Sequence, residues 1–131
     1  MPGKFIVTET RLLGLRVLVV EDEPLVAMLI EDLLTDLGCT VIGPANRLED
    51  ALQLVDQSVI DVAVLDVNLN GVESYPIANE LIRRGVPFLF SSGNGSHGLR
   101  KEYNHYPSLP KPFEEKDLAG ALALALMPAR S

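Results

Sequence analysis

Cysteine, tryptophan and positive charge are scarce in this chain. Cys39 is the single cysteine among 131 residues, and there is no tryptophan. One cysteine excludes a disulfide framework and a cysteine metal cluster within the chain, so we expect Cys39 to be a small core residue. The chain has 11 basic and 18 acidic residues, for a net charge of −7. Nucleic-acid-binding domains normally carry a basic patch, so this composition argues against nucleic acid as a partner.

Long apolar runs are also missing. No stretch approaches the roughly 18 consecutive apolar residues that a membrane span requires. Lys4 precedes only a short apolar run, and Arg16 interrupts the next one, so we predict no signal peptide. We therefore expect a soluble, cytoplasmic protein with no membrane partner. The length fits one domain, which we place over residues 16–127, with an N-terminal extension over 1–15 and a tail over 128–131.

Short apolar runs alternate along the chain with segments of helical periodicity. This pattern predicts strands over 16–20, 40–43, 61–65, 87–90 and 108–109. It predicts helices over 24–37, 47–55, 75–84 and 114–127, the second of them capped by Asn46. Strands that alternate with helices form a parallel sheet with helices on both faces. The sequence thus predicts an α/β, flavodoxin-like (βα)5 three-layer sandwich, with a parallel five-stranded sheet of order 2-1-3-4-5.

The helix predicted over 24–37 has apolar residues on more than one side. At about 100° per residue, its core face should consist of Val26, Leu29, Ile30, Leu33 and Leu37. Leu25 and Met28 fall off this face, near the end of the first strand. We expect these two residues to stay exposed and to contact a partner protein.

The helix predicted over 114–127 is apolar on its outer side as well. Its core face should consist of Leu118, Ala121, Leu122 and Ala125. The opposite side carries Gly120, Ala123, Leu124 and Met127, where a solvated helix should be polar. Exposed apolar patches often mark contacts. We expect this face to form a homodimer or to meet another partner, unless the N-terminal extension covers it.

Acidic residues follow two of the predicted strands. Glu21 and Asp22 come directly after the apolar run 17–20, and Asp66 follows the run 62–65. In open α/β sheets the carboxyl ends of the strands form the ligand-binding edge. Clustered carboxylates repel one another, so this arrangement needs a cation. Ligands that are oxygen only, with no cysteine or histidine nearby, favour Mg²⁺ or a similar hard ion such as Mn²⁺.

Two more polar positions lie at the same predicted edge. Ser92 follows the fourth strand, and the segment Lys111-Pro112-Phe113 follows the fifth. Acidic residues at strand ends are common, but all four features in this order are distinctive. Over residues 16–127 the chain resembles the receiver domain of two-component response regulators.

The resemblance implies a metal site and a phosphoacceptor. Asp66 would form an aspartyl phosphate. Asp22 and Asp66 would bind Mg²⁺ directly, Glu21 would act through a water molecule, and the main-chain carbonyl of Asn68 would complete the protein ligands. A carboxylate is a poor nucleophile toward a phosphoryl dianion unless charge is neutralised, and phosphoryl transfer depends mostly on positioning and electrostatics.

The resemblance also assigns the groups that hold the phosphoryl oxygens. Ser92 would bond one of them, although its neighbour Ser91 competes for this role, and we favour Ser92 because it directly precedes Gly93. Lys111 would pair with another, and its peptide bond to Pro112 is usually cis in the family.

The sequence departs from the common receiver pattern at one position. Receivers usually carry an aromatic residue three positions before the lysine, but here that residue is Ser108, with Tyr106 two positions earlier. The segment between Ser92 and Lys111 is short and rich in glycine at its start, so only a short helix fits there.

The run 87–93 reads PFLFSSG and resembles a single-domain receiver subgroup that often pairs with histidine kinases of the HWE type.

These features predict a phosphoacceptor response regulator rather than an enzyme, with only self-catalysed phosphotransfer and autodephosphorylation at Asp66. Its partners would be a sensor histidine kinase, of the HWE type or otherwise, or a phosphotransfer protein, together with an unknown downstream protein. Because only four residues follow the last predicted helix, we expect no DNA-binding output domain. One alternative is a non-phosphorylated pseudo-receiver that acts as a constitutive interaction module. Another is a phosphatase of the haloacid-dehalogenase type, disfavoured because its second acid would fall at Asn68.

Overall fold

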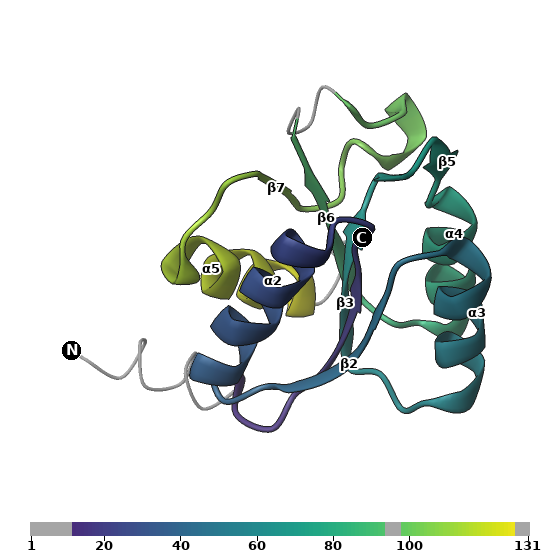
Figure 1. Cartoon of the computed structure of the whole chain (residues 1–131). Coiled ribbons are helices and arrows are strands. Elements are labelled where there is room, and N and C mark those ends of the chain that lie inside the picture. The colour runs from purple at the N-terminus through teal and green to yellow at the C-terminus, as the bar shows by residue number, and fades with distance from the viewer. Residues whose placement is uncertain (1–11, 94–97, 128–131) are drawn as a thin grey trace.

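The computed structural model describes residues 12–93 and 98–127, and a central parallel sheet dominates it (Figure 1). The sheet consists of β1 (Arg16–Val20), β2 (Thr40–Ala45), β3 (Val62–Asp66), β6 (Phe88–Ser92) and β7 (Ser108–Pro110). Their order across the sheet is β2-β1-β3-β6-β7, with every neighbouring pair parallel. The predicted flavodoxin-like order 2-1-3-4-5 is therefore confirmed.

Helices cover both faces of this sheet. Figure 1 shows α2 (Pro24–Asp36) and α5 (Glu115–Leu126) on one face, and α3 (Leu48–Gln57) and α4 (Tyr75–Arg84) on the other. The bounds of α4 are those predicted, because Gly85 ends the helix in the left-handed conformation with φ 72°. In α5 the side chains of Glu114 and Asp117 form a reciprocal capping box at the N-terminus.

The start of α3 differs from the prediction. Arg47, and not Asn46, is the N-cap residue, and the helix begins at Leu48. Glu49 and Asp50 occupy the first turn, where negative charge is favourable to the helix dipole. The Arg47 guanidinium pairs with the Glu49 carboxylate at 2.8 Å. Charge in the first turn therefore sets this helix start, without a side-chain cap.

Alternate residues of the central strands supply two separate cores. Leu18 and Val20 of β1 pack with α3 and α4, whereas Val17 and Val19 pack with α2 and α5. Cys39 belongs to the second core, as expected, and its thiol donates to the Leu12 carbonyl at 3.3 Å. Because both faces of the sheet are covered, the strands read as continuous apolar runs rather than alternating ones.

The predicted core face of α2 is partly wrong. Ile30 is buried, but the other buried residues are Ala27 and Leu34, and Leu29 is exposed. The helix is apolar almost all the way round, so periodicity alone does not select one face. Leu25 and Met28 are exposed, as predicted.

The outer side of α5 is apolar and exposed, as predicted. Leu118 and Leu122 are buried in the core, while Leu124 is 56% and Met127 is 48% exposed. Gly120 lies on the same outer side. Residues 1–11, which include most of the predicted extension, and the tail 128–131 lie outside the described residues.

Strand β2 runs two residues further than the sequence predicts. We expected it to end at Gly43, yet it continues through Pro44 to Ala45. Gly43 has φ 95°, the Gly43–Pro44 peptide bond is cis, and the pairing with β1 shifts register between Leu18 and Val20. β2 is an edge strand, where proline is tolerated because one side of the backbone needs no partner.

A small hairpin occupies the region predicted as a loop after β3. Its strands are β4 (Asn68–Leu69) and β5 (Val72–Glu73), which pair antiparallel. The turn residues Asn70 and Gly71 have φ 54° and 89°. This combination of residues and positive φ values is typical of a type I′ hairpin turn.

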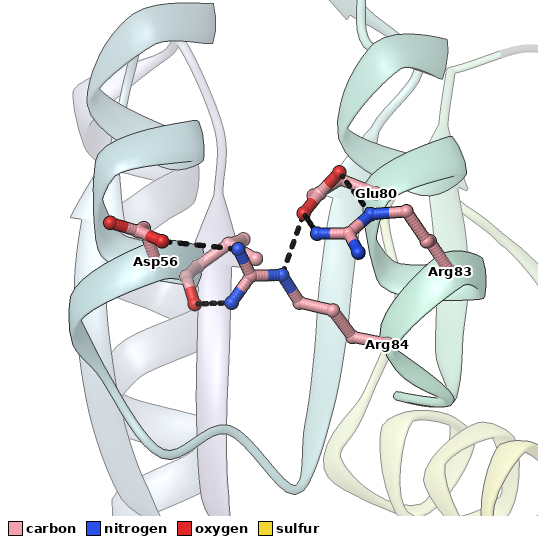
Figure 2. A network of polar contacts seen from close by, with 5 residues as sticks. Asp56, Glu80, Arg83 and Arg84 are labelled. Carbon is pink, nitrogen blue, oxygen red and sulfur yellow. Dashed lines mark hydrogen bonds and ion pairs between the residues drawn. The ribbon is translucent and has the colours of Figure 1, made fainter.

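An ion-pair network ties α3 to α4 (Figure 2). The Arg84 guanidinium pairs with Glu80 at 2.7 Å and with Asp56 of α3 at 3.1 Å, and it also donates to the Val55 carbonyl at 3.2 Å. Glu80 accepts from Arg83 as well, and the two arginines lower the pKa of Glu80 to about 2. The Val55 carbonyl lies in the last turn of α3, where carbonyl groups have no partner within the helix. Arg84 therefore joins the two helices, whereas Arg83 contacts only Glu80 of its own helix.

The backbone at Gly43 generates the first prediction. A Cβ atom at this position would lie 2.8 Å from the Ala45 nitrogen and 3.1 Å from the Val19 oxygen, in addition to the positive φ. We expect Gly43→Ala to lower the free energy of unfolding by about 2–4 kcal/mol. Urea denaturation provides the measurement.

Gly120 offers a matched control. It lies within α5, and a Cβ atom there would meet nothing within 4 Å. Gly120→Ala should raise the free energy of unfolding by about 0.5–1 kcal/mol, because alanine is the better helix former. Equal effects of the two substitutions would contradict the account of β2.

Candidate functional site

Three carboxylates converge at the carboxyl ends of β1 and β3. Glu21 and Asp22 directly follow β1, and Asp66 is the last residue of β3. One oxygen from each of the three side chains can be chosen so that all lie within 4.8 Å of one another. Glu21 and Asp66 are buried, and Asp22 is partly exposed. The structure thus brings together the acidic residues that the sequence placed at one sheet edge.

Lys111 supplies positive charge to this cluster. Its ammonium nitrogen lies 2.7 Å from Glu21 Oε1 and 3.3 Å from Asp66 Oδ2. The Lys111 N–H donates to the Ser92 carbonyl at 3.0 Å, which extends the pairing of β6 and β7 to this residue. The Lys111–Pro112 peptide bond is cis, as the resemblance implied. The lysine side chain is only 17% exposed, so its charge acts in a largely desolvated site.

The β4–β5 hairpin also contacts the cluster, and the sequence did not predict this contact. The Asn70 N–H donates to Asp22 Oδ2 at 2.9 Å. The Asn68 N–H donates to Asp66 Oδ1 at 3.3 Å. The adjacent residues Asn70 and Gly71 could have indicated the hairpin, because an asparagine followed by a glycine favours a tight hairpin turn.

The electrostatics of the site penalise the ionised form of Asp66. Burial, together with the charge of Glu21, raises the pKa of Asp66 to about 7, against the opposing effect of Lys111. Burial alone would raise the pKa of Asp22, but hydrogen bonds with Asp66 and the Asn70 N–H lower it overall. Burial would lower the pKa of Lys111, but Glu21 and Asp66 raise it overall.

One ammonium does not balance three clustered carboxylates, and the donor set suits a hard divalent cation. All available ligands are oxygens, which Mg²⁺ and Mn²⁺ prefer. The raised pKa of Asp66 is the expected result when like charges are held together in a desolvated site. The residues present therefore fit the metal that the sequence implied.

The two serines of β6 differ in their surroundings. Ser91 is opposite Asp66 in the sheet register and is fully buried, and its hydroxyl has no hydrogen-bond partner among the described residues. Ser92 is the last residue of the strand and is 7% exposed. The assignment of the phosphoryl contact to Ser92 stays a prediction.

Aromatic residues pack near Ser108, the position three residues before Lys111 at which receivers usually carry an aromatic residue. Ser108 pairs with Phe90 in the sheet, so a serine side chain stands where the family usually has an aromatic ring. The Tyr106 ring stacks on Phe88 with centroids 4.6 Å apart. The predicted short helix is present as a 3-10 turn, η2 (Lys101–Tyr103). His105, just after this turn, is exposed, and His97 lies outside the described residues.

Within residues 12–93 and 98–127, no helix combines the length and the apolar character that crossing a membrane requires.

Comparison with known proteins places this site in a family. The family model for the response regulator receiver domain matches residues 17–123. The positive alginate biosynthesis regulatory protein of Pseudomonas aeruginosa is 32% identical over 121 residues, which are 88% of this chain and 49% of that protein. The chain spans about half the length of the curated relatives it matches.

Solved structures extend the similarity to nearly whole chains. The solution structure of SdrG from Sphingomonas melonis Fr1 superposes with a TM-score of 0.79 at 39% identity, covering 88% of this chain and 98% of that chain. The BeF3-activated conformation of SdrG from Pseudomonas melonis Fr1 has a TM-score of 0.76 at 41% identity, covering 86% and 96%. Sequence, fold and acidic site agree, and the chain belongs to the response regulator receiver domain family.

Proposed function

We propose that Asp66 accepts a phosphoryl group from a phosphohistidine, and that this modification switches a protein-binding surface in signal transduction. The observation that carries the proposal is the position of Lys111, whose ammonium nitrogen lies 3.3 Å from Asp66 Oδ2 inside the three-carboxylate cluster. A buried lysine and two further acids around one strand-end aspartate suit a nucleophile whose product carries more negative charge. The BeF3-activated conformation of SdrG supports the same reading.

The proposed reaction moves one phosphoryl group. A carboxylate oxygen of Asp66 forms a bond to phosphorus while the phosphorus–nitrogen bond of the phosphohistidine breaks, and the imidazole nitrogen keeps the electron pair. When bound, Mg²⁺ supplies positive charge that neutralises the phosphoryl oxygens. Asp22, Asp66 and the main-chain carbonyl of Asn68 would hold it, with Glu21 acting through water. Lys111 and Ser92 would bind the remaining phosphoryl oxygens.

The partners follow from the proposed chemistry. Receiver domains work with histidine kinases, and we propose a sensor kinase of the HWE type, or a phosphotransfer protein, as the donor for this chain. The subgroup pattern at residues 87–93 supports this choice. We place the protein in the cytoplasm, where such donors act. Its own chemistry would be limited to phosphotransfer and autodephosphorylation at Asp66, and a downstream protein would read the result.

We also propose that the outer face of α5 forms a homodimer. Gly120, Leu124 and Met127 are exposed on this face at helical spacing, and the two larger side chains are apolar. A helix face of this kind leaves apolar surface in water that a second copy can cover.

Phosphorylation of the purified protein is the primary test. Incubation with acetyl phosphate or a phosphorylated kinase domain should give an acid-stable, base-labile label that requires Mg²⁺ and is lost in Asp66→Ala. No label with any competent donor would leave the constitutive pseudo-receiver as the better account of the protein.

The two serines provide matched variants within the same experiment. Ser92→Ala should slow labelling by about tenfold to a hundredfold, because a hydrogen bond to a charged group contributes about 1.5–3 kcal/mol. Ser91→Ala should leave the rate near that of the wild type. The reverse order would move the phosphoryl contact to Ser91.

The burial of Asp66 predicts a pH dependence of stability in the metal-free protein. The pKa of Asp66 is about 7 in the folded state and near its ordinary value of 3.8 in the unfolded state. The folded state thus holds the proton more tightly, and its stability declines as pH rises from about 4 through 7. Asp66→Asn removes this penalty and should be more stable than wild type at pH 8 by roughly 2–4 kcal/mol.

Urea denaturation in a metal chelator at pH 5, 6, 7 and 8 measures this difference. The stability gained by Asp66→Asn should shrink as pH falls, because the wild-type carboxyl becomes protonated. Asp32→Asn, on the exposed side of α2, controls for removal of one charge. A gain that grows toward low pH would contradict the proposed charge state of the site.

The dimer proposal predicts a change of solution mass. Leu124→Glu places a charge in the centre of the α5 face and should convert a dimer to a monomer in light-scattering measurements. Ile82→Glu alters a comparably exposed apolar residue on α4 and should leave the mass unchanged. Monomers for the wild type and both variants would refute the α5 dimer.

A further inference from the structure

We propose that Arg100 is a positioning residue for the metal site, acting through Glu73 on the main-chain carbonyl of Asn68. This inference rests on the proposed function, which makes that carbonyl a metal ligand. Arg100 lies just before η2, on a segment that the phosphoacceptor chemistry does not otherwise use. Its side chain contacts neither Asp66 nor the other acids of the site in any interaction found among the described residues.

Arg100 is fixed by three contacts to the region around the start of α4. Its guanidinium forms an ion pair with the Glu73 carboxylate of β5. The same guanidinium lies over the Tyr75 ring, 4.9 Å from the centroid. Its backbone N–H donates to the Tyr75 hydroxyl at 2.8 Å. An ion pair, a cation–π contact and a backbone hydrogen bond together hold Arg100 against this part of the fold.

Tyr75 provides a rigid base for these contacts. It is 3% exposed, and its ring stacks on Tyr103 with centroids 4.3 Å apart and an interplanar angle of 11°. The Tyr103 hydroxyl donates to Asn79 Oδ1 at 2.7 Å, which joins η2 to α4. The guanidinium therefore extends from a packed aromatic layer toward β5, the exposed strand of a hairpin whose other strand buries Leu69.

Glu73 lies directly across the hairpin from Asn68. The two residues are partners in the β4–β5 register, and the other pair of this hairpin is Leu69 with Val72. Hairpins of two-residue strands have little stability of their own. The Ser74 N–H bonds the Val67 carbonyl at 2.9 Å and closes the base of the loop. Arg100 thus anchors the strand opposite the proposed ligand.

The tip of the hairpin has a separate anchor in the metal site itself. The Asn70 N–H donates to Asp22 Oδ2 at 2.9 Å, and the Gly71 N–H donates to Asn68 Oδ1 at 2.6 Å. Asp22 therefore holds one end of the hairpin and Arg100 the other, with Asn68 between them. A carbonyl whose backbone is already ordered binds an ion with less loss of conformational entropy.

Mg²⁺ titration of the full chain, followed by backbone amide NMR signals, tests the inference. Arg100→Gln should bind Mg²⁺ about two- to fivefold more weakly than the wild type, the range expected for loss of a partly exposed ion pair. Arg100→Lys keeps the charge that Glu73 needs and should recover most of the affinity. Lys101→Gln removes the same charge from the neighbouring exposed residue and should leave the affinity unchanged.

Amide exchange in the metal-free protein provides a second measurement. Arg100→Gln should speed exchange of the Asn70 and Gly71 amide protons, since loosening the hairpin exposes both. The amides of β1 and β3 should be unaffected, which separates a local effect from general destabilisation. Unchanged hairpin exchange together with unchanged Mg²⁺ affinity would refute the role of Arg100. If the wild type itself binds no Mg²⁺, the proposed function fails instead.

Discussion

The mutual repulsion of Glu21, Asp22 and Asp66 is the constraint on which the rest of the site depends. Three strand-end carboxylates share a space in which one oxygen of each lies within 4.8 Å of the others. Lys111 offsets part of this charge, at 2.7 Å from Glu21 and 3.3 Å from Asp66. Burial, together with the negative charge that remains, raises the pKa of Asp66, and the excess charge favours a cation. A divalent cation held by these oxygens would relieve the repulsion, so the unfavourable energy of the metal-free site would add to the affinity for the ion.

From Val17 in β1 and from Val62 in β3, the strands that carry these charges are apolar up to the acids at their ends. β1 and β3 are buried on both faces, and α2, α3, α4 and α5 cover them (Figure 1). The acidic residues therefore lie at the carboxyl ends of these strands, where the apolar segments stop. At the opposite end of α3 and α4, the Arg84 network of Figure 2 fixes those helices to each other.

The sequence predicted the sheet order and the residues of the acidic site because both depend on strong local patterns. Apolar runs and strand-end acids are visible without knowledge of three-dimensional contacts. The predicted core face of α2 was partly wrong because Leu29 and Leu34 are equally apolar, and only the packing of the helix decides which of them is buried. The end of β2 was missed because an edge strand tolerates Gly43 and Pro44. The Glu73–Arg100 ion pair joins residues far apart in the chain, and no local pattern marks such a pair.

Ser108 stands at the position where receivers usually carry an aromatic residue, so the contacts between the acidic site and the surface must be made by other groups. The Tyr106 ring is partly buried, stacks on Phe88 with centroids 4.6 Å apart and packs against the core on the α3–α4 side of the sheet. Two backbone segments instead reach from the acids to the exterior. One is the β4–β5 hairpin, bonded to Asp22 through Asn70, and the other is the β7–α5 connection that carries Lys111. The hairpin contacts the acids through the Asn70 backbone N–H, whereas the β7–α5 connection contacts them through the Lys111 ammonium.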